Sequence, residues 1–172
     1  MKIQSLSIDM IHEDILNNFN RYQKTTKGLV MKGTKLIEKD LNFIDEWDGN
    51  NKLVVIEAMR KAVVDSGFVL GAFDEKKLIG FIVIEGKNYG VYRELSYIHV
   101  SNEHRGKGIG SKLFKESIEH ARQRGIKKYY IAAHPSIESQ RFYRGLGCDL
   151  ANYIIQEIFD KEPLDIQLEC EI

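Results

Sequence analysis

The sequence has few of the residues that build disulfide scaffolds, zinc sites or membrane spans. It contains two cysteines, Cys148 and Cys170, among 172 residues, too few for a disulfide framework or for a zinc site built on CxxC pairs. No apolar run approaches the roughly 20 residues that a membrane-spanning helix needs. The amino-terminal residues lack the basic head and apolar centre of a signal peptide. We therefore expect a cytoplasmic protein with no membrane partner.

An excess of charge of either sign is also missing. The chain has 25 Lys and Arg residues against 25 Asp and Glu residues, which disfavours a generally basic protein that binds nucleic acid. The five histidines show no metal-ligand spacing, so we expect no metal. What remains is an ordinary globular composition, 43% hydrophobic and 29% charged. The length predicts a single domain over residues 1–172.

Strand-like and helix-like segments alternate from Phe68 onward. The expected strands are Phe68–Phe73, Leu78–Glu85, a strand ending at Val100, Ile126–Ala133 and two strands that close the chain. The expected helices are Ile109–Arg124, which stops at Gly125, and a helix from an N-cap at Ser136 to about Leu146. This order predicts a mixed α/β sheet with flanking helices.

The amino-terminal segments carry weaker patterns. We expect a short strand and its exit over Ile3–Met10, and a helix around His12–Phe19. Between Asn20 and Asn50 a basic run precedes an acidic run, which is typical of a solvated helix–loop–helix. The turn Asp48–Asn51 predicts the start of another helix, and a glycine-rich loop is expected at Gly86–Gly90. The residues of that helix expected to face the core are Leu53, Val54, Ile56, Ala58 and Val63.

The most informative stretch lies between the strand ending at Val100 and the helix from Ile109. Three glycines, Gly106, Gly108 and Gly110, occupy alternate positions there. Alternate glycines permit positive φ, so that successive backbone N–H groups can turn inward. The helix that begins here adds unpaired N–H groups and the positive end of its dipole. The stretch therefore predicts a binding site for phosphate oxygens.

Two nucleotide-binding motifs do not fit this stretch. A P-loop requires a glycine where Ser101 stands, and a Ser or Thr after Lys107, where the chain has Gly108. A dinucleotide fingerprint requires Gly or Ala at Ser111, and an acid at the end of the next strand, which reads Ala-Ala-His. A plain turn without a ligand remains an alternative, although such a turn needs one glycine rather than three.

The pattern Arg-x-x-Gly-x-Gly, formed by Arg105, Gly108 and Gly110, resembles the pyrophosphate loop of the GCN5-related N-acetyltransferases (GNAT superfamily). Two other segments resemble the family in register. Arg93–Val100 is similar to its fourth strand. Ser139–Cys148 is similar to its Ser-x-x-Phe-Tyr-x-x-x-Gly-Phe helix, with Cys where Phe is usual. The specific resemblance covers Arg93–Cys148, and the order of elements extends it more weakly over Phe68–Ile172.

The resemblance implies a twisted mixed sheet whose fourth and fifth strands splay apart. Acetyl-CoA is the implied co-substrate, and its pantetheine arm would lie between those strands and pair with the backbone. Ser139 either contacts CoA or lies on the helix surface. The implied cofactor-binding residues are Ile98, His99, Val100, Arg105, Gly106, Lys107, Gly108, Ile109, Gly110, Ser111 and Ser139.

Two residues are candidates for the chemistry of acetyl transfer to an amine. Glu94 shares a strand face with Ser96 and Ile98, and many family members carry a carboxylate at this position. It is our candidate general base, and a solvent-facing or salt-bridged acid is the alternative. Tyr143 matches a tyrosine that many members place near the thioester sulfur. It is our candidate general acid, with aromatic packing as the alternative. His134 could join Tyr143 in a proton relay or be a satisfied loop histidine.

The amine acceptor carries no recognisable motif. Asp45, Glu46 and Asp48 surround Phe43 and Trp47, and this mixture of acids and aromatic rings would suit a cationic amine. The competing interpretation is that the rings anchor a helix while the acids face water. Two other functions stay open, a catalytically silent CoA-binding domain and a protein that binds another nucleotide. Association into a homodimer is also left open.

Overall fold

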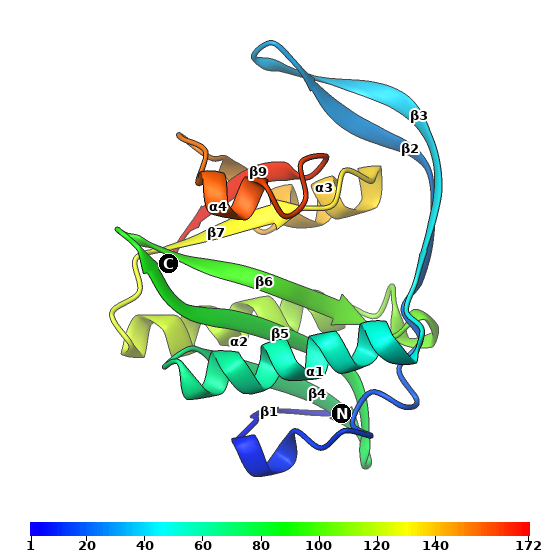
Figure 1. The fold of residues 1–172 in the computed structure, drawn as a ribbon, viewed down its shortest axis with the longest axis vertical. Helices are drawn as coiled ribbons and strands as arrows, with labels where there is room; N and C mark the ends of the chain where they lie inside the picture. Colours follow the sequence, from blue (N-terminus) through cyan, green and yellow to red (C-terminus); the bar gives the residue numbers. More distant parts are fainter.

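The computed structural model describes residues 1–172 and is built around a seven-stranded sheet (Figure 1). The strand order is β1-β4-β5-β6-β7-β9-β8, and every neighbouring pair is antiparallel except the parallel pair β6 and β7. The predicted mixed α/β sheet is confirmed. Its strands are β1 (Lys2–Ser5), β4 (Phe68–Asp74), β5 (Lys77–Tyr89), β6 (Tyr92–Val100), β7 (Lys128–Ala133), β8 (Asp149–Leu150) and β9 (Ile166–Glu171).

Helices cover both faces of this sheet, with α1 in front of it and α2 behind it in Figure 1. None of the helices is both long enough and apolar enough to cross a membrane. The α-helices are α1 (Gly49–Val64), α2 (Ile109–Gln123), α3 (Ile137–Gly145) and α4 (Gln156–Phe159), and short 3₁₀ turns occur at Ile8–Met10 and Asn102–His104.

Strand β4 contributes side chains to two separate hydrophobic cores, one on each face of the sheet. Leu70 is fully buried in the cluster that includes Leu113 of α2, whereas its neighbour Val69 is fully buried in the cluster that includes Met59 of α1. Side chains alternate between the two faces of a strand, and here each face is covered by a helix. A strand buried on both faces needs apolar residues throughout, which explains why the sequence of β4 is almost continuously hydrophobic.

Helix α1 starts where the sequence predicts, but it buries a different face. The Asp48 side chain accepts a hydrogen bond from the N–H of Asn51, and the Asn51 side chain accepts one from the N–H of Asp48, which forms a capping box. The buried residues are Val55, Ile56, Met59 and Ala62. The expectation for Leu53 and Val54 is wrong, since they are 46% and 63% exposed. The stripe at helical spacing through Met59 is the one that reaches the sheet.

Strands β6 and β7 separate after a short paired stretch. Their parallel ladder has three pairs and ends at Glu94 and Tyr130. A register shift on the opposite edge of β6 leaves Ser96 as a bulge between the pairs Ile84–Leu95 and Val83–Tyr97, and a bulge bends its strand. The two strands therefore diverge from this point, as the resemblance implied for the fourth and fifth strands.

Residues 20–50 form a long β-hairpin, so the predicted helix–loop–helix is wrong. Strands β2 (Tyr22–Lys32) and β3 (Lys35–Glu46) pair with each other and lie outside the main sheet. The loop is Gly33-Thr34, and Gly33 has a φ of +63°. A two-residue loop that begins with glycine is a hairpin signal. The charge runs lie on exposed hairpin edges rather than on helices.

Three smaller expectations also need correction. The segment His12–Phe19 forms successive turns instead of a helix, and these turns still bury Leu16 and Phe19. The expected loop Gly86–Gly90 is mostly the end of β5, which continues to Tyr89. The closing region contains the predicted strand β9, while its partner β8 has two residues, and the short helix α4 was not expected.

Candidate active site

A cleft of about 1250 Å³ opens where β6 and β7 separate. Its walls come from β6 with the turn that follows it, the start of α2, the hairpin β2–β3, α3, and the segment from α4 to β9. Figure 1 shows the hairpin rising from the end of β6 and arching past the open side of this gap. No group of three or more His, Cys, Asp or Glu side chains is placed to hold a metal ion.

The turn between β6 and α2 presents a row of free backbone N–H groups. Gly106 and Gly108 both have a φ of +74°, a conformation that glycine adopts without steric penalty. None of the N–H groups from Gly106 to Ser111 donates a hydrogen bond to another backbone group. Free N–H groups at a helix start, together with the helix dipole, bind phosphate oxygens. The local geometry of this turn thus suits a pyrophosphate.

The two basic side chains of this turn are already engaged. Arg105 donates from Nε to the carbonyl oxygen of Val100 at 3.0 Å and from Nη1 to that of Tyr22 at 2.8 Å. It thereby ties the turn to the base of the hairpin. Lys107 donates from Nζ to the carbonyl oxygen of Glu103 at 3.2 Å and does not line the cleft. Their contacts with phosphate stay predictions.

The edge of β6 that faces the gap offers backbone groups to an extended ligand. Ser101 donates its N–H to Ile79 of β5 at 2.9 Å, and backbone groups alternate between the two edges of a strand. His99 therefore directs its N–H and C=O to β5, whereas Ile98 and Val100 direct theirs to the gap. The expectation that His99 pairs with pantetheine is corrected for this reason.

Helix α3 packs against the start of α2. A Cβ at Gly110 would lie 3.2 Å from the ring of Phe142, so a larger residue would require the ring to shift by a few tenths of an ångström. Ser136 caps α3, because its Oγ accepts a hydrogen bond from the N–H of Ser139 at 3.3 Å. The Ser139 hydroxyl accepts from Ser136 Oγ at 2.9 Å. Gly110, Phe142 and Ser139 consequently border the same cleft.

Tyr143 lines the cleft from α3. Its side chain packs beside Phe142, with ring centroids 5.1 Å apart, and 7% of the residue is exposed. Burial raises the pKa of Tyr143, and the neighbouring acidic groups of Cys148 and Asp165 add to the shift. The phenol consequently keeps its proton at neutral pH, and it is placed where a proton donor could act.

His134 is held in place by hydrogen bonds rather than joined to Tyr143. Its Nδ1 accepts from the N–H of Ser136 at 3.2 Å, so its proton lies on Nε2, which donates to Asp45 Oδ2 at 3.1 Å. Burial lowers the pKa of His134, although Asp45 opposes that shift. The alternative of a satisfied loop histidine therefore describes His134, which links β7 to the hairpin.

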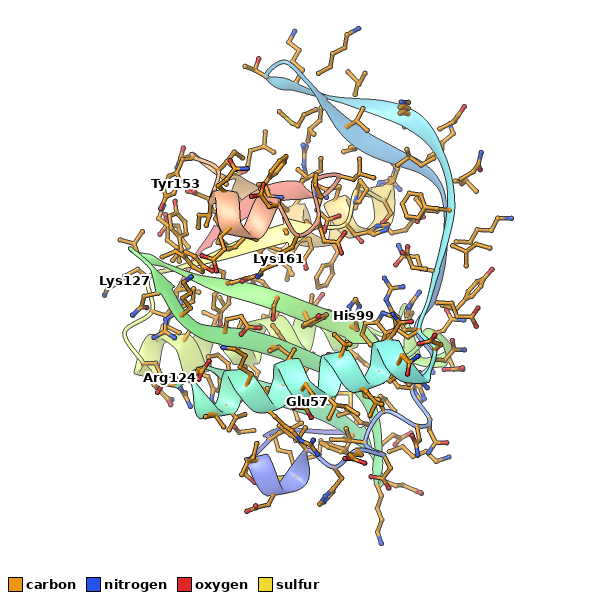
Figure 2. All side chains as sticks on the ribbon, in the orientation of Figure 1. Glu57, His99, Arg124, Lys127, Tyr153 and Lys161 are labelled. Atoms are coloured by element: carbon orange, nitrogen blue, oxygen red, sulfur yellow. The ribbon has the colours of Figure 1, made fainter.

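Glu94 lies at the last β6–β7 pair, just where the gap begins. Its side chain is 8% exposed, and both carboxylate oxygens lie within hydrogen-bond distance of Lys161 Nζ, at 3.2 and 3.3 Å. Lys161 lines the cleft, whereas Glu94 does not. In Figure 2, Lys161 extends from below α4 toward β6. The alternative of a salt-bridged acid is thus present, with Lys161 as the partner.

Part of the predicted acceptor segment Phe43–Asp48 reaches the cleft. Phe43 packs its ring against His134 instead, with centroids 5.3 Å apart, and Asp48 caps α1. The centroids of the Trp47 and His99 rings lie 4.9 Å apart. Burial lowers the pKa of His99 well below its ordinary value. The residues of this segment that line the cleft are Ile44, Asp45, Glu46 and Trp47.

Arg21 and Asp165 are among the cleft residues that lie outside every predicted motif. Arg21 is 7% exposed, its Nε and Nη1 have no hydrogen-bond partner, and burial lowers its pKa to about 10. Burial raises the pKa of Asp165 to about 7, with Glu162 and Asp45 adding to the shift. Single charged residues next to apolar segments carry no local signal, so only the tertiary arrangement identifies them.

Comparison with solved structures supports this fold over the whole chain. A nourseothricin acetyltransferase has a TM-score of 0.72 at 16% identity, with 99% of this chain and 97% of that chain covered. A protein described as a streptothricin acetyltransferase from Bacillus anthracis, in complex with acetyl coenzyme A, has a TM-score of 0.71 at 19% identity and coverages of 99% and 98%. PaiA N-acetyltransferase from Thermoplasma acidophilum, in complex with coenzyme A, has a TM-score of 0.60 at 18% identity and covers 100% of both chains.

The fold is shared with solved acetyltransferase structures, and the turn after β6 has a geometry that suits a pyrophosphate. The family model described as acetyltransferase (GNAT) family matches residues 34–148. The chain belongs to this family, and the resemblance inferred from its motifs is confirmed. A search of curated protein sequences gave no match.

Proposed function

We propose that the protein is a single N-acetyltransferase domain that transfers acetyl from acetyl-CoA to a primary amine. The observation that carries this proposal is the row of unpaired N–H groups from Gly106 to Ser111. These N–H groups follow the part of β6 that has no strand partner on the side of the gap, and Tyr143 of α3 lines the same cleft. Pyrophosphate, pantetheine and thioester would follow one another along these three features. Two of the structures similar in fold carry acetyl-CoA or CoA by their descriptions, which supports the co-substrate.

Direct transfer within a ternary complex fits the cysteines of the chain. Cys148 and Cys170 are 2% and 4% exposed and lie in the core, and neither lines the cleft. A hydrogen bond with Cys170 and burial raise the pKa of Cys148, which disfavours the thiolate needed for an acetyl-enzyme intermediate. The amine of the acceptor would then attack the thioester itself.

The reaction needs a proton donor for the leaving thiolate, and we assign this role to Tyr143. A free phenol with a pKa near 10 protonates a thiolate whose acid has a pKa near 8.5 only when it is positioned, since the transfer is uphill by about 2 kcal/mol. The raised pKa of Tyr143 makes the transfer less favourable still, so positioning matters more here. The packing of Tyr143 between Phe142 and the core supplies such positioning. The buried environment keeps the phenol protonated until the thiolate forms beside it.

The reaction also needs a proton acceptor. An alkyl ammonium with a pKa near 10.4 is neutral in only about one part in 2,500 at pH 7, a cost of roughly 4.6 kcal/mol. Glu94 is the acceptor that the family resemblance implies. Glu94 does not line the cleft, and both its oxygens contact Lys161, so the proton would reach it through Lys161 or a water molecule.

The acceptor amine is proposed to be a cationic one. Acidic side chains from the hairpin, β5 and the segment before β9 line the same cleft as Tyr143, and an ammonium group would be attracted to them. They are Asp45, Glu46, Glu85, Glu162 and Asp165. Structures similar in fold are described as acetyltransferases of nourseothricin, streptothricin and aminoglycosides, and these compounds belong in the first group of acceptors to test.

The test is a screen of amines for thiol release from acetyl-CoA. The panel contains the three antibiotic types named above, polyamines, amino sugars and a lysine peptide, with binding of acetyl-CoA measured in parallel by calorimetry. Amine-dependent thiol release with formation of the amide supports the proposal. Tight binding of acetyl-CoA without turnover of any amine would instead indicate a silent CoA-binding domain. Binding of ATP or NAD in preference to CoA would overturn both.

A further inference from the structure

Asp165, unlike Glu94, lines the cleft itself. Asp165 lies between α4 and β9, directly before the ladder pair Ile166–Ala133. Its backbone is fixed on both sides, because its N–H donates to the carbonyl oxygen of Glu162 and its carbonyl oxygen accepts from Gln167 Nε2, both at 3.0 Å. No hydrogen bond to its carboxylate contributes to its titration. A rigid backbone thus carries a free carboxylate at the cleft wall.

The groups that face Asp165 come from four elements. Glu162 lies on the same segment and Asp45 on β3, and their negative charges act on the Asp165 carboxyl. The charge of Asp165 in turn raises the pKa of Tyr143 on α3. His134, at the end of β7, is neutral and bound to Asp45. The neighbouring cation Lys161 contacts Glu94 instead, so no cation pairs with Asp165.

We propose that Asp165 accepts the proton directly from the ammonium group of the acceptor, and that Glu94 positions Lys161. This inference rests on the proposed function. Asp165 and Tyr143 line the same cleft and interact electrostatically, so an amine between them could lose a proton to one and attack a thioester beside the other. Burial with two neighbouring acids holds the pKa of Asp165 at about 7, and a base is most effective when its pKa lies near the working pH.

The step balances as follows. The ammonium nitrogen gives one proton to the Asp165 carboxylate and becomes a neutral amine. Its lone pair forms the C–N bond to the thioester carbonyl carbon, and the C–S bond breaks. The departing thiolate takes the Tyr143 proton, and the second proton on nitrogen returns to the Tyr143 phenolate. Asp165 releases its proton to water, so that each turnover yields an amide, a thiol and one proton.

The first test replaces the carboxylate by an amide of the same shape. Asp165→Asn should lower kcat by about 10²–10⁴-fold at pH 7.5 and leave the KM for acetyl-CoA unchanged. The deficit should shrink as the pH rises toward the pKa of the acceptor, because a free amine needs no base. Asp160→Asn is the matched control, since Asp160 is exposed and does not line the cleft. A kcat within a few-fold of the wild type at all pH values would overturn the assignment.

The second test moves the pKa of Asp165 without removing it. NMR titration of its carboxyl carbon in the ligand-free protein should give a pKa near 7, and Glu162→Gln should lower it by removing a neighbouring negative charge. The acid limb of the kcat profile should shift to lower pH in parallel. A carboxyl that titrates near 4, or a limb that stays in place when the carboxyl shifts, would contradict the proposal. Wild-type activity that persists in either case would leave the N-acetyltransferase function standing.

The stability of the variant provides a readout independent of turnover. The folded state raises the pKa of Asp165 from its ordinary value near 4, so it holds the proton more tightly than the unfolded chain. Stability is therefore lost as the pH rises from about 4 to about 7. Asp165→Asn removes this loss. The difference in melting temperature, variant minus wild type, should therefore increase by a few degrees from pH 5 to pH 8. No change in that difference would show that Asp165 is not a raised-pKa carboxylate.

Discussion

The two ends of the cleft are built in different ways. At the phosphate end, consecutive residues from Gly106 to Ser111 offer backbone N–H groups, and no side chain is required to point at the ligand. At the acceptor end, side chains arrive from the hairpin, from α3 and from the segment before β9. The sequence distance between Asp45 and Asp165 spans most of the chain, yet their charges interact. A site made of local backbone leaves a motif in the sequence, whereas a site made of distant side chains does not.

The two ends should also differ in how specifically they recognise their ligands. Backbone N–H groups recognise a pyrophosphate wherever the turn is preserved, so the phosphate end suits a co-substrate common to many enzymes. The proposed acceptor end depends on side chains, so we expect substitutions on the hairpin to change which amine it accepts. The hairpin is attached to the body at few points, among them the hydrogen bond from Leu29 N–H to the carbonyl oxygen of Pro135 at 2.8 Å. Glycine at Gly28 permits this approach, because a Cβ there would lie 2.8 Å from that oxygen.

The largest effect on turnover is expected at Tyr143, which lines the cleft. Tyr143→Phe keeps the ring and removes the proton, so turnover should fall about 10²–10⁴-fold while the affinity for acetyl-CoA changes little. Steady-state kinetics with a competent amine, together with calorimetry of acetyl-CoA binding, measure both quantities. Tyr153→Phe is the control, because Tyr153 is 51% exposed and lies outside the cleft. If turnover stays within a few-fold while chemistry limits the rate, Tyr143 serves only as packing.

The next effect concerns the phosphate end alone. Acetyl-CoA at 100 times its dissociation constant should stabilise the protein by about 2.7 kcal/mol, or about 5–10 °C in melting temperature. Gly108→Val should abolish this shift, because a β-branched residue opposes the positive φ and fills the phosphate space. Gly90→Val is matched to it, since Gly90 has a φ of +65° and an equally open surrounding but lies far from the turn in sequence.

Thermal melts with and without acetyl-CoA separate backbone strain from ligand contact. Both variants should melt below the wild type, and only Gly90→Val should keep the ligand-induced shift. A shift that survives in Gly108→Val would place the pyrophosphate elsewhere. Loss of the shift in both variants would show that general destabilisation, rather than this turn, accounts for the result.

The smallest effect belongs to the hairpin. Asp45→Asn combined with Glu46→Gln should raise the KM for the amine several-fold and leave the KM for acetyl-CoA unchanged. The melting temperature should fall only slightly, because the Asp45–His134 pair is partly exposed. Glu38→Gln is the control on the same hairpin, where Glu38 pairs with Lys27 in the open. An unaltered amine KM would remove Asp45 and Glu46 from the acceptor site.

The strands and helices from Phe68 onward could be predicted because local patterns decide them. Strand β4 is continuously apolar and is bounded by Gly67 and the turn at Asp74, while α2 is amphipathic and ends at Gly125, whose φ is +70°. The one local signal for the hairpin is the Gly33-Thr34 loop, and the charge runs of residues 20–50 suggested exposed helices instead. Strand pairing there buries few side chains, so the usual apolar pattern is weak.

The sequence by itself determined the family, the glycine-rich turn that we propose to bind phosphate, and the place of Tyr143 on its helix, since each depends on residues close together in the chain. Only the tertiary structure decided which edge of β6 faces the gap, and it turned the backbone of His99 away from it. It also joined Glu94 to Lys161 and placed Asp165 near Asp45 and Tyr143. The physical reason is that backbone geometry and capping are set by neighbours in sequence, whereas desolvation and charge interactions depend on which distant segments pack together.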